Sequence, residues 1–316
     1  MISETKPKKC RKLIYYVMLA VVILTWGIDP VVNKLQYENY SPLALSMLST
    51  IFSAVMFFIM SVKKLKLLNA RLLKIALPIG ILSSLACVLQ RVGLQLTTPS
   101  SYAFLEHLSC AFVPIALFLI TKKRPSIIQV ITVIICLIGC VLISGLINNF
   151  TSVNIGDVLC AIAGAMLGFS IALIASYAKD IDITLFTFIQ MSCYFIISLL
   201  GAILLNHFKL NGEPFEEFRF SFNVWHLLFA VFFGLFSVGI CWLLRNLAVA
   251  NINPIFVAIV SPFSAIISSI ISISIKIEPF TIELLIGGLL ISVAVIISSL
   301  SDNKNFIDKF KKKNHG

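Results

Sequence analysis

The chain is built from apolar stretches of roughly 20 residues, and these stretches limit its fold more than any other feature. The run Ile127–Ile147 is typical, because it shows no alternation of apolar and polar residues. A helix needs about 20 mostly apolar residues to cross about 30 Å of hydrocarbon, whereas a strand of a membrane barrel alternates strictly. The sequence therefore predicts an all-α membrane protein.

The composition excludes a soluble domain. Hydrophobic residues make up 59% of the 316 positions and charged residues 12%, and the mean hydropathy is +1.00. Soluble domains contain about 45–50% apolar and about 25% charged residues. The net charge of +11 would suggest a nucleic-acid partner in a soluble protein. Here the basic residues lie in tails and short loops, so we expect a lipid bilayer as the partner and no nucleic acid.

Turn residues and charges divide the chain into ten predicted spans. They cover residues 13–33, 41–62, 75–96, 100–120, 127–147, 155–178, 184–205, 225–248, 254–275 and 280–301. With the N-terminus inside, 19 of the 25 Lys and Arg residues fall on the inner side, four on the outer side and two within spans. This bias predicts that both termini are cytoplasmic.

The two halves of the chain repeat. A shift of 154 positions lays Arg91 on Arg245 and Pro125 on Pro279 without a gap. Five spans per half is an odd number, so the second half must be inverted in the membrane. We therefore expect a cytoplasmic N-tail at 1–12, one five-helix repeat at 13–147, an inverted five-helix repeat at 155–301, and a cytoplasmic C-tail at 302–316.

Several short motifs fit this architecture. Trp26-Gly27 is followed by Lys34, the stretch 93–98 reads Gly-Leu-Gln-Leu-Thr-Thr, Gly156-Asp157 opens the second half, and Pro262 lies in the ninth span. This pattern resembles the EamA-type carriers of the drug/metabolite transporter superfamily. The resemblance implies a secondary transporter with a central cavity, no nucleotide-binding domain and no cofactor.

Ionisable residues inside the spans are the first candidates for function, because each costs about 2.5–3.5 kcal/mol at the bilayer centre. Asp29, Arg91 and Glu106 are predicted to share one layer in the outer half of the membrane. Two interpretations remain open. Arg91 and Glu106 form a buried structural pair, or all three residues line a substrate cavity. In the second case Arg91 binds a carboxylate or phosphate, and an acid binds an amine or a proton.

Polar and aromatic neighbours complete the candidate site. Trp26 and Tyr102 each lie one helical turn from an acid, an arrangement that suits a bound amine. Gln90, His107 and Gln190 are the further substrate-binding candidates. For Arg245 we expect a structural role, because the position that corresponds to Glu106 carries Val260 and leaves Arg245 without an equivalent partner.

Other sequence features point to packing. Gly27 and Pro30 either break or kink the first helix. Gly164 and Gly168 predict close helix contact. Nearly all the cysteines lie in apolar runs, and Cys136 and Cys140, one helical turn apart, have no His or carboxylate nearby, so we expect packing and no metal site.

The leading functional prediction is a secondary transporter of an amino acid, an amine or a similar metabolite, working by alternating access. A proton or an exchanged solute is the candidate coupling partner, and a monomer or a homodimer is expected. The predicted location is the bacterial plasma membrane. The alternatives are a non-transporting receptor or scaffold and an intramembrane enzyme. We expect no enzyme, because motifs such as HExxH or GxSxG are absent from the sequence.

Overall fold

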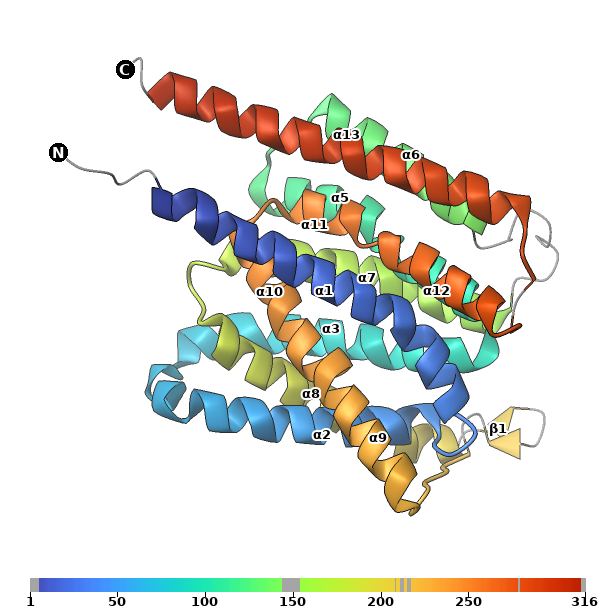
Figure 1. The fold of residues 1–316 in the computed structure, drawn as a ribbon. Helices are drawn as coiled ribbons and strands as arrows, with labels where there is room; N and C mark the ends of the chain where they lie inside the picture. The colour runs from blue at the N-terminus through green and yellow to red at the C-terminus, as the bar shows by residue number, and fades with distance from the viewer. Residues whose placement is uncertain are drawn as a thin grey trace.

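The computed structural model describes residues 6–143, 154–207, 209–210, 213–214, 217–277 and 279–313. Helices make up nearly all of it, with one short antiparallel hairpin between β1 (Lys209–Leu210) and β2 (Glu213–Pro214) (Figure 1). The helices of the first half are α1 (Lys6–Gln36), α2 (Pro42–Ser61), η1 (Val62–Leu67), α3 (Ala70–Leu96), α4 (Pro99–Glu106), α5 (Ser109–Thr121) and α6 (Ile127–Ile143). Those of the second half are α7 (Ile155–Tyr177), α8 (Ile183–His207), α9 (Val224–Gly234), η3 (Leu235–Ile240), α10 (Cys241–Asn251), α11 (Pro254–Val260), α12 (Phe263–Ser274) and α13 (Ile282–Lys313).

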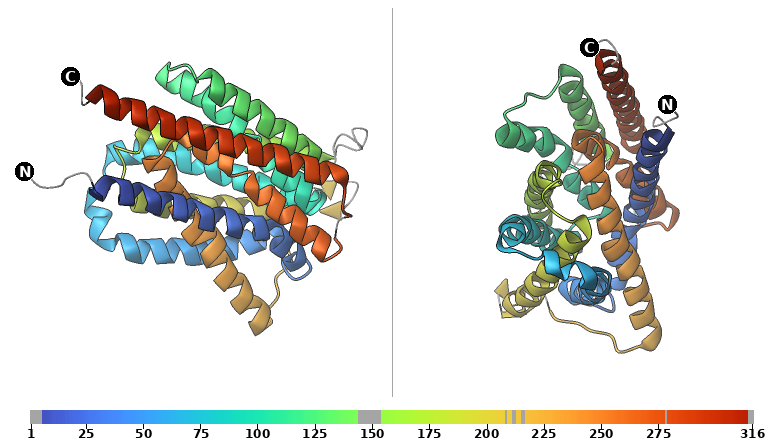
Figure 2. Two further views of the ribbon diagram at one scale, coloured as in Figure 1. Left: turned by 45° about the horizontal axis from the view of Figure 1, so that its top comes forward. Right: turned by 90° about the vertical axis from the view of Figure 1, so that its left-hand side faces the viewer.

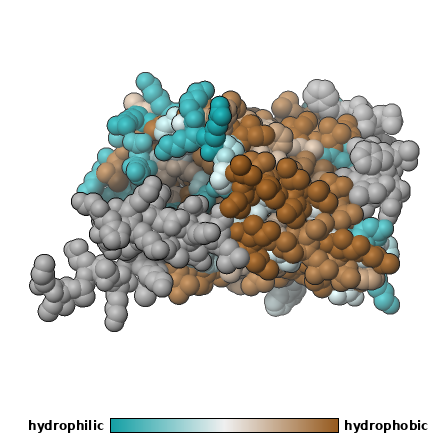
Figure 3. All heavy atoms as spheres, turned by 90° about the horizontal axis from the view of Figure 1, so that it is seen from above, coloured by the Kyte–Doolittle hydropathy of each residue, from teal (hydrophilic) through white to brown (hydrophobic). Residues whose placement is uncertain are grey.

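The bundle is a multi-pass membrane protein. In the described residues, eight helical segments are long and apolar enough to cross a bilayer, and the apolar stretches 127–142 and 285–298 are shorter. Figure 3 shows a band of apolar side chains over the middle of one face and hydrophilic ones toward an end. The predicted all-α membrane class is confirmed. The exact number of crossings stays a prediction.

Three of the long segments are not regular helices throughout. One is interrupted at His107-Leu108, between α4 and α5, and another at Ser261-Pro262, between α11 and α12. The third runs from α9 into α10 through η3, a stretch of π-helix. Such wide turns occur often at functional sites. The first helix is not broken, because α1 continues through Pro30.

The turns before the two interrupted segments are built alike. Thr98 caps α4 by accepting a hydrogen bond from the Ser101 backbone, and Pro99 follows it. Asn253 caps α11 by accepting from the Ile255 backbone, and a proline again follows. A side-chain oxygen at the cap satisfies a free N–H group, and proline is tolerated at the first helical position.

The helices pack in pairs across the two halves of the chain. α2 packs against α8, and α6 packs against α13. α6 and α13 lie together at one edge of the bundle in Figures 1 and 2. α3 and α5 contact α7, while α10 and α12 contact α1. Gly164 and Gly168 allow α7 to approach closely, because a Cβ atom there would meet the backbone oxygens of Leu105 and Ser109. The predicted close contact at these glycines is confirmed.

The start of α1 and the end of α13 lie at the same end of the bundle (Figures 1 and 2). Two ion pairs join the connection between α2 and α3 to the turn between α7 and α8. Lys64 Nζ lies 2.8 Å from Asp182 Oδ2, and Arg71 Nη2 lies 2.9 Å from Asp180 Oδ1.

Candidate functional site

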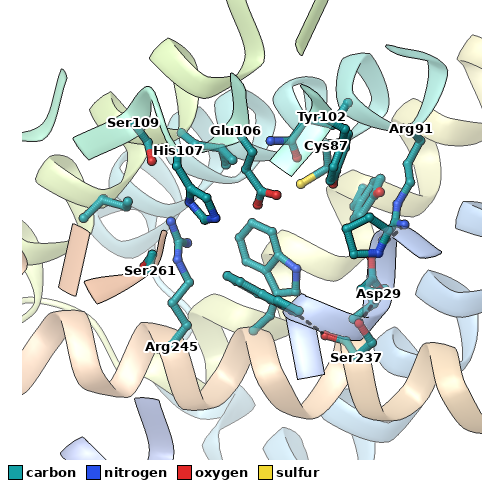
Figure 4. Close-up of a pocket in the computed structure, with 18 residues that line it drawn as sticks. Asp29, Cys87, Arg91, Tyr102, Glu106, His107, Ser109, Ser237, Arg245 and Ser261 are labelled. Carbon is teal, nitrogen blue, oxygen red and sulfur yellow. Dashed lines mark hydrogen bonds and ion pairs between the residues drawn. The ribbon is translucent and has the colours of Figure 1, made fainter. Parts of the chain in front are cut away.

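A polar pocket lies between the helices of both halves (Figure 4). The space within it amounts to ≈ 660 Å³ when the open solvent at its mouth is included. Seven of the eight predicted site residues line it. The full lining is Trp26, Asp29, Pro30, Cys87, Gln90, Arg91, Tyr102, Glu106, His107, Ser109, Leu167, Ile171, Tyr194, Ser237, Val238, Trp242, Arg245 and Ser261.

Asp29 and Arg91 form a buried ion pair on one side of this pocket. Arg91 Nη1 lies 3.0 Å from Asp29 Oδ2, and the two side chains are 12% and 8% exposed. Asn33 donates to the same carboxylate oxygen at 2.6 Å, and the Ser237 hydroxyl donates to the other oxygen. Three donors thus compensate the Asp29 carboxylate for the water it loses on burial.

The π-helical stretch contributes directly to this arrangement. The Trp26 indole N–H donates to the backbone carbonyl of Ser237 at 3.1 Å, while the Ser237 hydroxyl reaches Asp29. A π turn shifts the hydrogen-bond pattern of the helix and can leave a carbonyl available to a side chain. Residues of α1 therefore fix both the backbone and the side chain of Ser237.

Glu106 does not pair with Arg91, which corrects one of the two interpretations drawn from the sequence. The partner of Arg91 is Asp29, on α1. Within the described residues Glu106 takes part in no ion pair. It stands at the end of α4, where the helix is interrupted, and in Figure 4 its carboxylate points into the pocket.

Arg245 also lines the pocket, although we expected only a structural role for it. Its side chain is buried at 4% exposure, so it does not reach the surface. Its guanidinium carbon lies 5.0 Å from the ring centroid of Trp242 and 5.8 Å from that of Trp26. Its Nη1 atom is buried without a hydrogen-bond partner, and none of the ion pairs among the described residues includes it.

His107 joins the two interrupted segments. It lies in the break after α4, is 3% exposed, and its Nε2 atom is 2.7 Å from the Ser264 hydroxyl on α12. The packing of α4 on α12 is extended by the Ser100 and Ser269 hydroxyls, which are 3.0 Å apart. The breaks in both segments therefore meet beside the pocket.

The two predicted glutamines have different positions. Gln90 lines the pocket, and its Nε2 atom is buried without a partner. Gln190 lies outside the pocket lining, and its substrate-binding role stays a prediction. Its amide donates to Ser83 at 2.7 Å and accepts from Asn246 at 2.8 Å. These bonds tie α8 to α3 and α10, because a buried amide must satisfy both of its ends.

The comparisons with known proteins identify the family. The model of the EamA-like transporter family matches residues 13–145 and 154–300. The chain belongs to the EamA-like transporter family. The family lies in the drug/metabolite transporter superfamily, so the predicted resemblance is confirmed and the protein is a transporter.

Two further similarities agree with this membership. An "Uncharacterized transporter" of Archaeoglobus fulgidus is 27% identical over 282 residues, which cover 89% of this chain and 84% of that one. A crystal structure of a protein has a TM-score of 0.68 with this EamA-like transporter at 13% identity, covering 92% of this chain and 98% of the other. The second similarity is evidence for the fold alone.

The pocket of this EamA-like transporter holds more functional candidates than the sequence reasoning named. Arg245, Trp242, Ser237 and Tyr194 were not among the predicted site residues. For Arg245 a signal existed, because the 154-residue shift places it on Arg91. In an inverted repeat, equivalent positions approach the midplane from opposite sides. Both arginines were therefore candidates for the same cavity.

The side chains that the structure describes offer no obvious metal site. Among the described residues, no group of three or more His, Cys, Asp or Glu side chains is arranged to hold a metal ion. The charged groups of the pocket are two carboxylates, Asp29 and Glu106, and two guanidinium groups, Arg91 and Arg245. Such a set suits the binding of a polar organic molecule.

Proposed function

We propose that this EamA-like transporter is a secondary carrier of a small polar or amphipathic metabolite, such as an amino acid or an amine. The observation that carries the proposal is the buried pocket with two acids and two arginines. Charges within a membrane bundle are costly and mark substrate pathways. Aromatic and aliphatic walls beside a few polar groups are typical of small-molecule sites.

The proposed mechanism is alternating access of two inverted five-helix repeats, at 13–147 and 155–301. The helix contacts support it. The proposed repeat relates α1 to α7 and α3 to α10, and the contact of α3 with α7 has its counterpart in the contact of α10 with α1. The breaks support it as well. The 154-residue shift carries His107-Leu108 onto Ser261-Pro262. In such transporters the substrate site lies between the repeats near the midplane.

The proposed topology has ten crossings and cytoplasmic ends in a bacterial plasma membrane. α6 and α13 would supply the fifth and tenth crossings, since both contain an apolar stretch. The start of α1 and the end of α13 lie at the same end of the bundle, which supports an even number of crossings. η1 brings Lys63, Lys64 and Lys66 to a turn on the side proposed to be cytoplasmic, as the positive-inside rule requires.

Glu106 is the proposed site of coupling. Its carboxylate faces the pocket and has no ion-pair partner among the described residues. Such a carboxylate can take up a proton or bind an exchanged cationic group. A receptor or scaffold would not need a charged cavity between its helices, so the pocket favours transport over that alternative.

Flux through purified protein in liposomes tests the proposal. We expect at least one member of a panel of amines, carboxylic acids and amino acids to enter protein-containing vesicles faster than protein-free vesicles. Glu106→Gln should abolish the response to an imposed pH gradient, while the matched surface variant Glu38→Gln should retain it. Glu38 is exposed after the end of α1 and lies outside the pocket. Absence of flux for every compound would contradict the transport proposal.

A further inference from the structure

The two arginines of the pocket differ in their electrostatic surroundings. The Arg91 guanidinium is neutralised by Asp29 at 3.0 Å. The Arg245 guanidinium lies over the rings of Trp26 and Trp242, and its Nη1 atom is buried without a hydrogen-bond partner. Aromatic faces attract a cation but accept no strong hydrogen bond in the plane of the guanidinium. The Nη1 donor of Arg245 is therefore left for a ligand to bind.

Among the described residues, the helices packed against α10 supply no free carboxylate to Arg245. α10 packs against α1, α7, α8 and α11. On α1 the carboxylate of Asp29 is already bound by Arg91, and on α7 Asp157 accepts from Thr97 at 2.6 Å. α8 and α11 contain no acidic residue. The side chains that α7 presents to the pocket are Leu167 and Ile171.

Glu106 is the complementary group on the other side of the pocket. In Figure 4 its carboxylate and the Arg245 guanidinium both extend into the pocket, from different helices. No ion pair joins them. With Asp29 and Arg91 neutralising each other, the pocket offers one available cation and one available anion. A ligand with a single charge would leave one of these groups uncompensated, which is costly in a buried site.

We propose that the pocket binds a zwitterion, with its carboxylate on the Arg245 guanidinium and its ammonium group on the Glu106 carboxylate. An arginine fork binds a carboxylate through two parallel hydrogen bonds. The uncharged part of the molecule lies against Trp26, Trp242 and Val238, which line the same pocket. This inference rests on the proposed transport function and narrows its substrate to amino carboxylates.

Matched ligands test the proposal with the purified full-length protein in detergent. L-phenylalanine, 2-phenylethylamine and 3-phenylpropionate share one skeleton, and L-leucine, 3-methylbutylamine and 4-methylpentanoate form a second set. In at least one set we expect the amino acid to bind about 10- to 100-fold more tightly than either singly charged analogue, as is usual for hydrogen bonds to charged groups. Equal binding of the amine or the acid would overturn the proposal.

Two variants assign the ends of the ligand. Arg245→Gln should lower the affinity for the amino acid to the level of the amine. The affinity for the amine itself should not change. Arg245→Lys should restore part of the lost affinity for the amino acid. Glu106→Gln should lower the affinity for the amino acid to the level of the carboxylic acid analogue. Arg124→Gln, at an exposed position, and Glu38→Gln are the matched controls. A purely structural Arg245 would weaken all three ligands alike, which would contradict the assignment.

The outcomes separate this inference from the transport function. If no amino acid of either set binds, while another compound crosses liposomes that contain the protein, the zwitterion proposal fails and the carrier stands. If no compound crosses, the carrier proposal itself fails. Should Arg245→Gln not fold, the ranking of the matched ligands on the unmodified protein still decides the inference.

Discussion

Asp29 on α1 and Arg91 on α3 are joined by an ion pair of 3.0 Å inside the bundle. The hydroxyl of Tyr37, the residue that follows α1, donates to the Arg91 backbone carbonyl at 3.2 Å. α1 and the turn that follows it are therefore attached to α3 by a charged and a neutral hydrogen bond. This attachment sets one wall of the pocket.

Asp29→Asn should destabilise the protein strongly. Loss of the charge leaves the Arg91 guanidinium buried and uncompensated, which typically costs about 3–5 kcal/mol. The melting temperature in detergent measures the effect, and Glu38→Gln is the control for a surface charge. The double variant Asp29→Asn/Arg91→Gln should lose less stability than the sum of the single changes. Additive losses would show that the pair does not act as a unit.

Gly164→Ala should weaken the contact of α7 with α4. A Cβ atom at this position would meet the backbone oxygen of Leu105, which cannot move without shifting the helix end. Overpacking of this kind costs about 1–3 kcal/mol. Gly288→Ala is the matched control, since its Cβ atom would make only ordinary contacts with Ile266, at 3.7–3.9 Å. Equal melting temperatures for the two variants would contradict the close packing.

The Lys64–Asp182 pair should make a small, pH-dependent contribution to stability. Partial burial acts to raise the pKa of Asp182, but the Lys64 ammonium and the backbone N–H groups of Leu185 and Thr184 outweigh it, so the pKa is lowered. A carboxyl group with a lowered folded-state pKa stabilises the protein fully above its unfolded pKa, about 3.9, and loses this contribution as the pH falls through the folded value.

Comparison of Asp182→Asn with the unmodified protein measures this contribution. The difference in stability should be at most about 1 kcal/mol at pH 7, because the pair is partly exposed. It should shrink as the pH falls below about 4. The melting temperatures of both proteins across this range provide the test. A difference that grows with acidity would contradict the sign.

Much of the fold followed from the sequence. The apolar runs predicted the long helices to within a few residues at most ends, as for α2 at Pro42–Ser61 against the predicted 41–62. The predicted layer of Asp29, Arg91 and Glu106 does line one pocket. Depth along a helix can be counted from the sequence, since each residue advances the helix by about 1.5 Å.

The partners of the charges could not be predicted in the same way. The sequence placed Arg91 opposite Glu106 across a helical hairpin, whereas the structure pairs it with Asp29 on another helix. Depth does not determine the direction in which a side chain points around its helix axis. The packing of α1 against α10 and of α3 against α7 decides that direction.

The sequence by itself determined the membrane class, the approximate positions of the helices and the set of charged residues that the bundle has to bury. The tertiary structure alone decided that Asp29 neutralises Arg91 while Arg245 keeps an unpartnered guanidinium nitrogen between two tryptophans. The physical reason is that hydrophobicity along the chain selects what enters the bilayer, whereas charge pairing depends on contacts between helices far apart in the sequence.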